Sequence, residues 1–546
     1  MMAKEPKKIK ERTAEERLIR NSEIRNGEFV RYYGKDAEIV IPDGVTMISE
    51  DAFRGNLYLT SLTIGKNVLT ISESAFRDCA NLRSISFSSG LREIGKDAFR
   101  GCKALVSAIL PRSVLSLSDG VFRGCSSLQH VILPDTIERI GAYAFSGCEA
   151  LEEIDLPVHL KAIRHGMFLN CSSLKHIELP KDTQTVGQYA FCRCFALENV
   201  SFPDGVTYIG SGAFGECDTL TEFISPPKLK FVSDDCFVCC DNLEHVTLSD
   251  QITHIGEDAF CGCKKLKNIV LPAALQRIGQ EAFLQCLSLE SILIPSTVTE
   301  IARSAFAYCE ALSQVEMQAS LEVLEEECFF GCFKLETITL PDTVTKIGDK
   351  AFGRCISLTA IRIPQCLTHL GERVFSDCHS LRSISLPASL KSIGNRAFEG
   401  CQHLETVLMP DGNCSVGYSI FTGCEALSVL VLSGKQRFFR RSLEKWNVGE
   451  ETQIILHSEL RLAWLFASLT DKETPQEQKA ELRQEIRTLL RAMKKRNHLY
   501  SVESIEANMK LILDAIGEQL APDPEALQKE ELSLKEDAAN EEAAES

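Results

Sequence analysis

Closely spaced cysteines are the residues of this chain most able to do chemistry, because thiolates bind zinc and carry out redox reactions. Cys236 and Cys239 have C-x-x-C spacing, and Cys261 follows further along. Cys240 and Cys263 are nearby, but a regular pattern described below accounts for both. Three candidate ligands remain, whereas structural zinc takes four. Surplus thiols in a cysteine-rich repeat are therefore the favoured interpretation, a metal or redox site is the alternative, and we expect no cofactor.

Histidines offer a second possible metal site. His130, His176 and His245 occupy the same position of the pattern, two and three repeats apart. At the spacing of paired strands these intervals are roughly 10 and 14 Å, too far to share one metal ion. We interpret them as surface or recognition residues. The sequence also has no P-loop, dinucleotide-binding glycine pattern, G-x-S-x-G or H-E-x-x-H, so it predicts a protein that is not an enzyme.

The pattern is a strict repeat of 23 residues. Phenylalanine recurs at this interval seventeen times, from Phe53 to Phe421. Each is followed six residues later by leucine and three residues later by cysteine, except that the first copy has Asn56 in place of the cysteine. Sixteen of the 23 cysteines thus belong to one column. Repetition at such a period predicts stacked units that bury their apolar faces against one another.

Each copy predicts the same elements. In the copy that starts at Leu151, the pattern L-x-x-I-x-L predicts a short strand that ends at Pro157. A second apolar pair, Leu160 and Ile163, predicts a return strand. The glycine that often follows, as at Gly95, is expected to permit a turn backbone. The segment A-F-x-x-C-x-x-L then predicts a 3₁₀ turn or a single α turn.

Stacking of these units gives the predicted fold, which is an α/β-type solenoid of about 17 coils. One face carries a parallel β-sheet, and the other carries short strands and 3₁₀ or α turns. Strand pairing at roughly 4.8 Å would place each phenylalanine on the next and each thiol on the next. In this arrangement a small dehydrated thiol fills a gap that a larger side chain would overfill.

The repeat resembles a known family. The stretch "LPDTVTKIGDKAFGRCISL", from Leu340 to Leu358, is similar to the BspA-type leucine-rich repeat, and the resemblance extends over roughly residues 36 to 432. It implies a leucine-rich-repeat solenoid that binds other macromolecules. Many members of this family are cell-surface or secreted adhesion proteins.

Four segments are expected along the chain. Residues 1–28 form a charged N-terminal segment, and residues 29–434 form the solenoid with an N-terminal cap strand. Residues 435–520 contain amphipathic helices, interpreted as a cap over the last coil or as a separate docking module. Trp446 and Trp464 near the junction favour the cap. Residues 521–546 form an acidic, disordered tail.

Charge and targeting signals restrict the partners. The net charge of −17 argues against nucleic acid or an anionic membrane surface as the main partner. The N-terminus lacks the apolar segment of a secretory signal, and no stretch is long and apolar enough to span a bilayer. We therefore expect a cytoplasmic protein, with the cell surface or secretion by an unrecognised route as the alternative.

The concave sheet face is the candidate binding site, because residues flanking the central apolar position of each strand point away from the core. A smaller apolar spot combines Val270 with Leu293. Exposed β-branched residues also simply suit strands, which remains the competing explanation. The predicted function is a non-enzymatic scaffold that binds a protein partner; the alternatives are a surface or secreted adhesin, and a metal or redox protein using the Cys236–Cys263 cluster. The candidate binding residues are Ile109, His130, Ile132, Glu153, Asp155, His176, Glu178 and Asn199.

Overall fold

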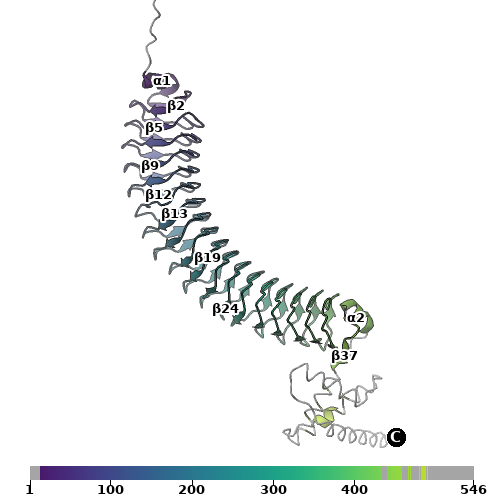
Figure 1. Ribbon diagram of the computed structural model, residues 1–546. Coiled ribbons are helices and arrows are strands. Elements are labelled where there is room, and N and C mark those ends of the chain that lie inside the picture. The colour runs from purple at the N-terminus through teal and green to yellow at the C-terminus, as the bar shows by residue number, and fades with distance from the viewer. Residues whose placement is uncertain are drawn as a thin grey trace, which may run out of the picture. The chain divides into compact units, whose positions relative to one another are not determined.

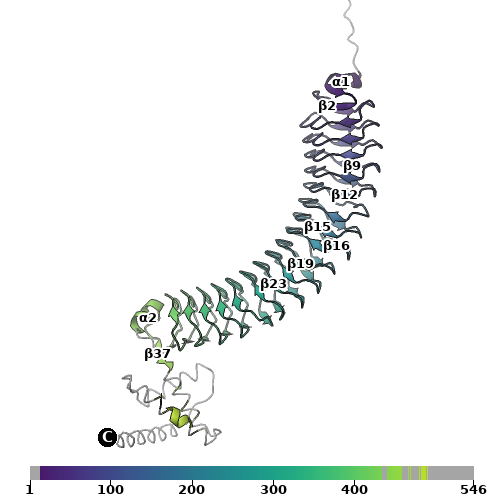
Figure 2. The same ribbon diagram turned by 180° about the vertical axis from the view of Figure 1, so that it is seen from behind.

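The computed structural model describes residues 13–432 and 439–457, and beyond these only positions 461, 465, 468, 479, 481–486, 488 and 489. The chain divides into two compact units, Met1–Ala319 and Ser320–Ser546, which are considered separately. Both are built from stacked coils of parallel strands, as predicted (Figures 1 and 2). Within the described residues, no helix is long and apolar enough to cross a membrane.

Each coil of the first unit contributes two short strands, except that the coil starting at Leu151 has only the second. The first strand lies within the predicted L-x-x-I-x-L segment, and its exposed side chains form what we call the first-strand face. These strands are β3 (Glu38–Val40), β5 (Ser61–Thr63), β7 (Ser84–Ser86), β9 (Ser107–Ile109), β11 (His130–Ile132), β14 (His176–Glu178), β16 (Asn199–Ser201), β18 (Glu222–Ile224), β20 (His245–Thr247), β22 (Asn268–Ile269), β24 (Ser291–Ile294) and β26 (Gln314–Met317). The second strands are β4 (Met47–Ile48), β6 (Thr70–Ile71), β8 (Glu93–Ile94), β10 (Ser116–Leu117), β12 (Arg139–Ile140), β13 (Ala162–Ile163), β15 (Thr185–Val186), β17 (Tyr208–Ile209), β19 (Phe231–Val232), β21 (His254–Ile255), β23 (Arg277–Ile278) and β25 (Glu300–Ile301).

A small cap precedes the first coil. Helix α1 (Ala14–Arg20) begins with a capping box in which Thr13 and Glu16 satisfy each other's backbone N–H groups. Strand β1 (Ser22–Arg25) then pairs antiparallel with β2 (Glu28–Tyr32), and β2 pairs parallel with β4. The cap therefore covers the apolar end of the array, which a solenoid requires.

The phenylalanine column is buried, as predicted. All seventeen rings are at most 2% exposed. In the first unit, consecutive rings from Phe53 to Phe306 stack with centroids 4.9–5.9 Å apart, and Phe29 of the cap extends the stack. Such offset stacking adds to the free energy gained from burial.

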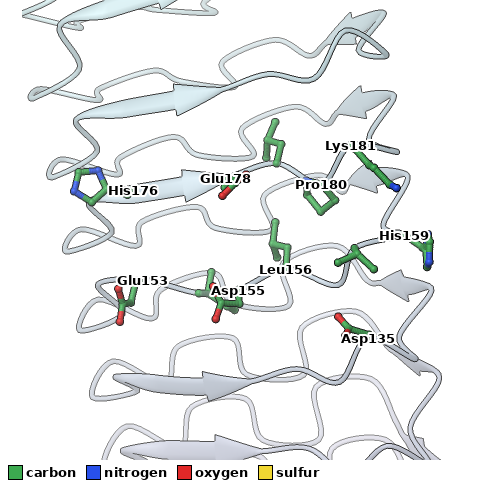
Figure 3. Close-up of a pocket in the computed structure, with 12 residues that line it drawn as sticks. Asp135, Glu153, Asp155, Leu156, His159, His176, Glu178, Pro180 and Lys181 are labelled. Atoms are coloured by element: carbon green, nitrogen blue, oxygen red, sulfur yellow. The ribbon is translucent and has the colours of Figure 1, made fainter.

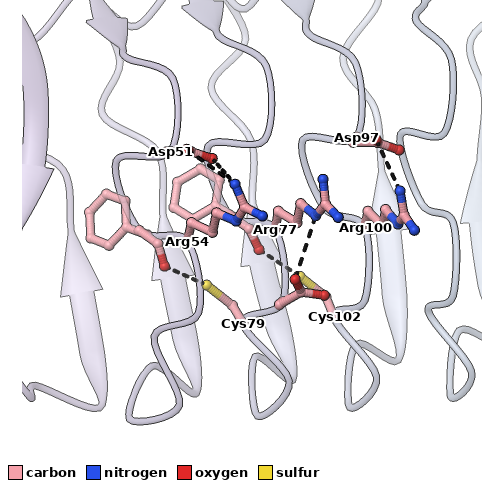
Figure 4. A network of polar contacts seen from close by, with 10 residues as sticks. Asp51, Arg54, Arg77, Cys79, Asp97, Arg100 and Cys102 are labelled. Atoms are coloured by element: carbon pink, nitrogen blue, oxygen red, sulfur yellow. Dashed lines mark hydrogen bonds and ion pairs between the residues drawn. The ribbon is translucent and has the colours of Figure 1, made fainter.

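The column cysteines make a hydrogen bond that their spacing did not reveal. Cys79 Sγ donates to the carbonyl of Phe53 at 3.1 Å, and Cys102 Sγ donates to that of Phe76 at 3.2 Å (Figure 4). Each thiol thus reaches the phenylalanine of the preceding coil, and this contact recurs along the array. Every column cysteine except Cys424 is buried. The thiol is therefore both a small apolar filler and a second donor to a buried carbonyl, which also accepts a backbone N–H, as Phe76 O does from Cys79 N.

The glycine after the second strand serves a different purpose from the one expected. Gly95 and Gly141 do not have a positive φ; instead, a Cβ on either would lie 2.4–2.5 Å from backbone atoms of the preceding coil. Close approach of the coils therefore excludes a side chain there. The left-handed backbone lies two residues before and two after each phenylalanine, where non-glycine residues such as Asp97 and Arg193 adopt it (φ 53° and 62°).

The second unit is built from coils of the same kind. Its first strands are β28 (Thr337–Thr339), β30 (Ala360–Arg362), β32 (Ser383–Ser385), β34 (Thr406–Leu408) and β36 (Val429–Leu432). Its second strands are β27 (Val323–Leu324), β29 (Lys346–Ile347), β31 (His369–Leu370), β33 (Ser392–Ile393) and β35 (Ser415–Val416).

The second unit ends with α2 (Phe439–Trp446) and β37 (Gln453–Leu456), which pairs parallel with β36. The backbone N–H of Phe421 donates to the carbonyl of Trp446, so this segment follows the last coil closely. Of the helices predicted between residues 458 and 520, only single positions and the stretch 481–486 are described. Residues 490–520 of the predicted helical segment and the acidic tail, residues 521–546, lie outside the described residues, as do residues 1–12.

Candidate functional site

The eight candidate residues are all exposed on or beside the first-strand face of the first unit. Strands β9 and β11 pair in register, so that Ile109 lies beside Ile132 and Ser107 beside His130. Strands β14 and β16 likewise place His176 beside Asn199. The repeat therefore arranges these side chains in columns that run from coil to coil.

The strand predicted in the coil that starts at Leu151 does not form. Glu153, Ile154 and Asp155 are in no strand, and in the described part of the chain no hydrogen bond joins their backbone to the neighbouring coils. Acidic residues suit strands poorly, and the pattern places Asp155 one coil from Glu178, where like charges destabilise pairing. The core is unaffected, because Phe145 and Phe168 still stack at 5.6 Å. The predicted strand is therefore wrong here. The apolar residues follow the pattern, but the exposed acidic residues oppose strand pairing.

An open hollow of about 860 Å³ lies at this interruption. Figure 3 shows the coil with Glu153 and Asp155 as a plain trace next to the strand that carries His176 and Glu178. The apolar part of the lining comprises Ile154, Leu156, Val158, Leu179 and Pro180. The polar part comprises Asp135, Glu153, Asp155, His159, His176, Glu178 and Lys181.

Four of the predicted residues therefore meet at one place: Glu153, Asp155, His176 and Glu178. The structure adds Asp135, His159 and Lys181, which come from the connections between first and second strands. Asp135, His159 and Lys181 lie outside the strand columns from which binding residues were predicted. Nothing in the 23-residue pattern indicated that the connections carrying them border a hollow.

Some charged groups around the hollow are paired. Lys175 Nζ lies 2.7 Å from Glu152 Oε2, and this hydrogen bond lowers the pKa of the Glu152 carboxyl. His159 Nδ1 lies 2.9 Å from Asp182 Oδ2, which lowers the pKa of the Asp182 carboxyl in the same way. His176 Nε2 lies 3.7 Å from Glu198 Oε2.

The four carboxylates that line the hollow are not paired in this way. Asp135, Glu153, Asp155 and Glu178 have no ion pair and no side-chain hydrogen bond with any residue in the described ranges. Unpaired carboxylates close together produce a negative potential that attracts cations.

An exposed apolar patch adjoins the hollow. Ile109 is 61% exposed and Ile132 is 56% exposed. The second spot that the sequence suggested, Val270 with Leu293, is exposed too, but it lies farther along the array. Exposed apolar side chains edged by polar groups are typical of interaction surfaces.

The three cysteines considered as metal ligands are not arranged as a metal site. Cys236 is buried, whereas Cys239 is exposed and Cys261 is half-buried. Burial, together with the nearby Asp258 carboxylate, raises the pKa of Cys261 to about 12, and burial also raises the pKa values of Cys236 and Cys239. Thiols with raised pKa values are poor ligands and nucleophiles. No group of three or more His, Cys, Asp or Glu residues in the described ranges is placed to hold a metal ion.

Comparison with known proteins is consistent with this architecture. The model of the BspA type leucine-rich repeat region matches residues 22–131, 92–204, 184–313 and 299–428. The chain belongs to the BspA-type leucine-rich repeat family. BspA-type repeats thus account for almost the whole array, including the coils that form the hollow. No curated protein matches the chain.

Solved structures similar to this BspA-type chain include bacterial leucine-rich repeat proteins. A leucine-rich repeat protein from Bacteroides ovatus is 25% identical, with 79% of this chain and 94% of that chain covered and a TM-score of 0.49. A leucine-rich cell surface protein from Faecalibacterium prausnitzii is 22% identical, with 78% and 93% covered and a TM-score of 0.31. The pneumococcal vaccine antigen PcpA is 18% identical, with 79% and 91% covered and a TM-score of 0.37.

Proposed function

We propose that the protein is a non-enzymatic scaffold that binds a protein partner on the first-strand face of its first unit, over the coils that contain Ile109 to Asn199. The observation that supports this proposal is that an exposed apolar pair, Ile109 and Ile132, lies next to a polar hollow on a rigid array. Rigidity favours binding because little conformational entropy is lost when the partner docks. Leucine-rich repeat proteins of this family are generally non-enzymatic scaffolds, and this family membership supports the proposal.

The proposal is tested by quantitative pull-down with the full chain as bait. The test variant is Ile109→Ser with Ile132→Ser, and its control is Leu69→Ser with Leu115→Ser, two exposed leucines that precede second strands. A partner retained by the control and lost by the test variant supports the proposal. Equal capture by both variants and by the wild type would show that this face is not the binding site.

For the compartment, we propose the cytoplasm, with the cell surface as the alternative. The chain has 23 cysteines, so the two locations differ in expected redox state. Fractionation of cells followed by a count of reactive thiols in denaturant separates them. Recovery in the surface fraction would favour an adhesin role, which the same first-strand face can also serve.

A further inference from the structure

We propose that the apolar patch of Ile109 and Ile132, with the adjoining hollow, binds an extended segment of a partner protein in which large apolar residues are followed by lysine or arginine. This inference rests on the proposed function and specifies the chemistry of the partner. The apolar patch is expected to contact apolar side chains of the partner. The charge of the neighbouring coils then determines which charged residues of the partner lie next to those side chains.

The apolar half of the surface is a pair of isoleucines. The pairing of β9 with β11 brings Ile109 and Ile132 side by side, and both project from the sheet with more than half of their surface exposed. Covering such a pair removes apolar area from water, which favours binding by roughly 25 cal/mol per Å² before the costs of association.

The neighbouring charge is mainly negative. In the column that contains Ile109 and Ile132, the next two coils supply Asp155 and Glu178. Glu153 and Asp135 lie on the same hollow, which one lysine, Lys181, also lines. In the described residues none of these four carboxylates forms an ion pair or a side-chain hydrogen bond, unlike Glu152 with Lys175, although Lys175 also interacts electrostatically with Glu153. A partner that brings cationic side chains here would gain charge-assisted contacts, whereas an acidic partner would be repelled.

The spacing suits one extended segment. The centre of the Ile109 and Ile132 pair and the centre of the Asp155 and Glu178 pair are two coils apart, which is roughly 10 Å at strand spacing. An extended chain rises about 3.3 Å per residue, so this separation corresponds to about three residues. Side chains two or four residues apart point to the same face, and long lysine or arginine side chains can make up the difference.

A synthetic peptide tests the proposal with the full chain. The probe is fluorescein-labelled, C-terminally amidated Leu-Ser-Leu-Ser-Lys-Ser-Lys, measured by fluorescence anisotropy at low salt. Its matched peptides carry glutamate in place of lysine, or serine in place of leucine. The test variant is Asp155→Asn with Glu178→Gln, and the control is Glu222→Gln with Glu316→Gln, which removes two exposed carboxylates elsewhere on the same face.

We expect the probe to bind the wild type and the control variant alike, and the test variant about tenfold more weakly, as expected for the loss of two partly exposed charge contacts. Both matched peptides should bind more weakly than the probe. Amide hydrogen exchange should show protection by the probe confined to the coils around Ile109 to Glu178.

Other outcomes would overturn the inference. Equal affinity of the probe for the test and control variants would show that the hollow does not recognise the lysines of the peptide. Protection outside these coils, or none, would place the peptide elsewhere. Sedimentation showing a dimer of this chain that Ile109→Ser abolishes would assign the patch to a second copy. If the isoleucine variants lose a cellular partner but Asp155→Asn with Glu178→Gln does not, the proposed function stands and the partner chemistry is wrong.

Discussion

Replacing Phe237 by alanine tests the aromatic column at a ring that contacts three others. The ring is fully buried and contacts Phe214 at 5.6 Å, Phe260 at 5.4 Å and Phe223 at 4.4 Å between centroids. Truncation of a buried phenylalanine costs about 3–5 kcal/mol, and each aromatic pair adds about 0.5–1.5 kcal/mol beyond area burial. Measured truncation costs already include lost ring contacts, so the three pairs place Phe237→Ala at the upper end of this range, at about 5 kcal/mol.

Because each coil contacts only its neighbours, this cost should be felt locally. Native-state hydrogen exchange read coil by coil is therefore the suitable assay, since a long array does not unfold in one two-state step. Amides in the coils of Phe214, Phe237 and Phe260 should lose protection, while the coil of Phe99 should keep it. The matched control is Phe231→Ala, which removes a ring that is 37% exposed. Unchanged protection around Phe237, or a loss equal to that of the control, would refute the buried stack as the source of stability.

Two further predictions concern coil spacing and pH. Gly141→Ala should destabilise the first unit by about 1–3 kcal/mol in urea titrations, because the added Cβ would lie 2.4 Å from Asp119 N. The control Gly44→Ala should have little effect, because the space around Gly44 is open. Equal effects of the two substitutions would contradict the proposed collision. Burial raises the pKa of Asp258 from 3.8 to about 6, so the protonated form is favoured in the folded state and stability falls as pH rises from about 4 to above 6. Asp258→Asn should thus raise the melting temperature above pH 6 and lose this advantage near pH 4 in calorimetry, and a difference that does not change with pH would contradict the assignment.

The repeat made the fold predictable, because a strict period allows one copy to stand for all. The burial of the phenylalanines, the parallel strands and the exposure of Ile109, His130 and their neighbours all follow from alternation and stacking. The interruption at Glu153–Asp155 did not follow, because it depends on how charges in adjacent coils oppose pairing rather than on the apolar pattern. The hollow was unpredictable for the same reason.

The role of Gly95 and its equivalents also could not be predicted from the sequence. A glycine required by a left-handed backbone and one required by a close neighbour look alike in a single chain. The structure separates them, since the left-handed positions hold residues such as Asp97 and Arg193 whereas the glycine sites face backbone atoms. The hydrogen bond of the column cysteines also could not be predicted, because packing alone already explained a small apolar side chain at that position.

The direction of that thiol contact bears on how the molecule is made. Each sulfur donates backwards, to a carbonyl that precedes it by 26 residues, as Cys171 does to Phe145. A ribosome releases the acceptor before the donor, so every newly emerging turn finds its anchor already in place. The first repeat has no earlier phenylalanine of the series, and there Asn56 Nδ2 reaches Gly34 O at 3.5 Å instead. The protein is thus suited to winding up progressively from its amino-terminal end while synthesis continues.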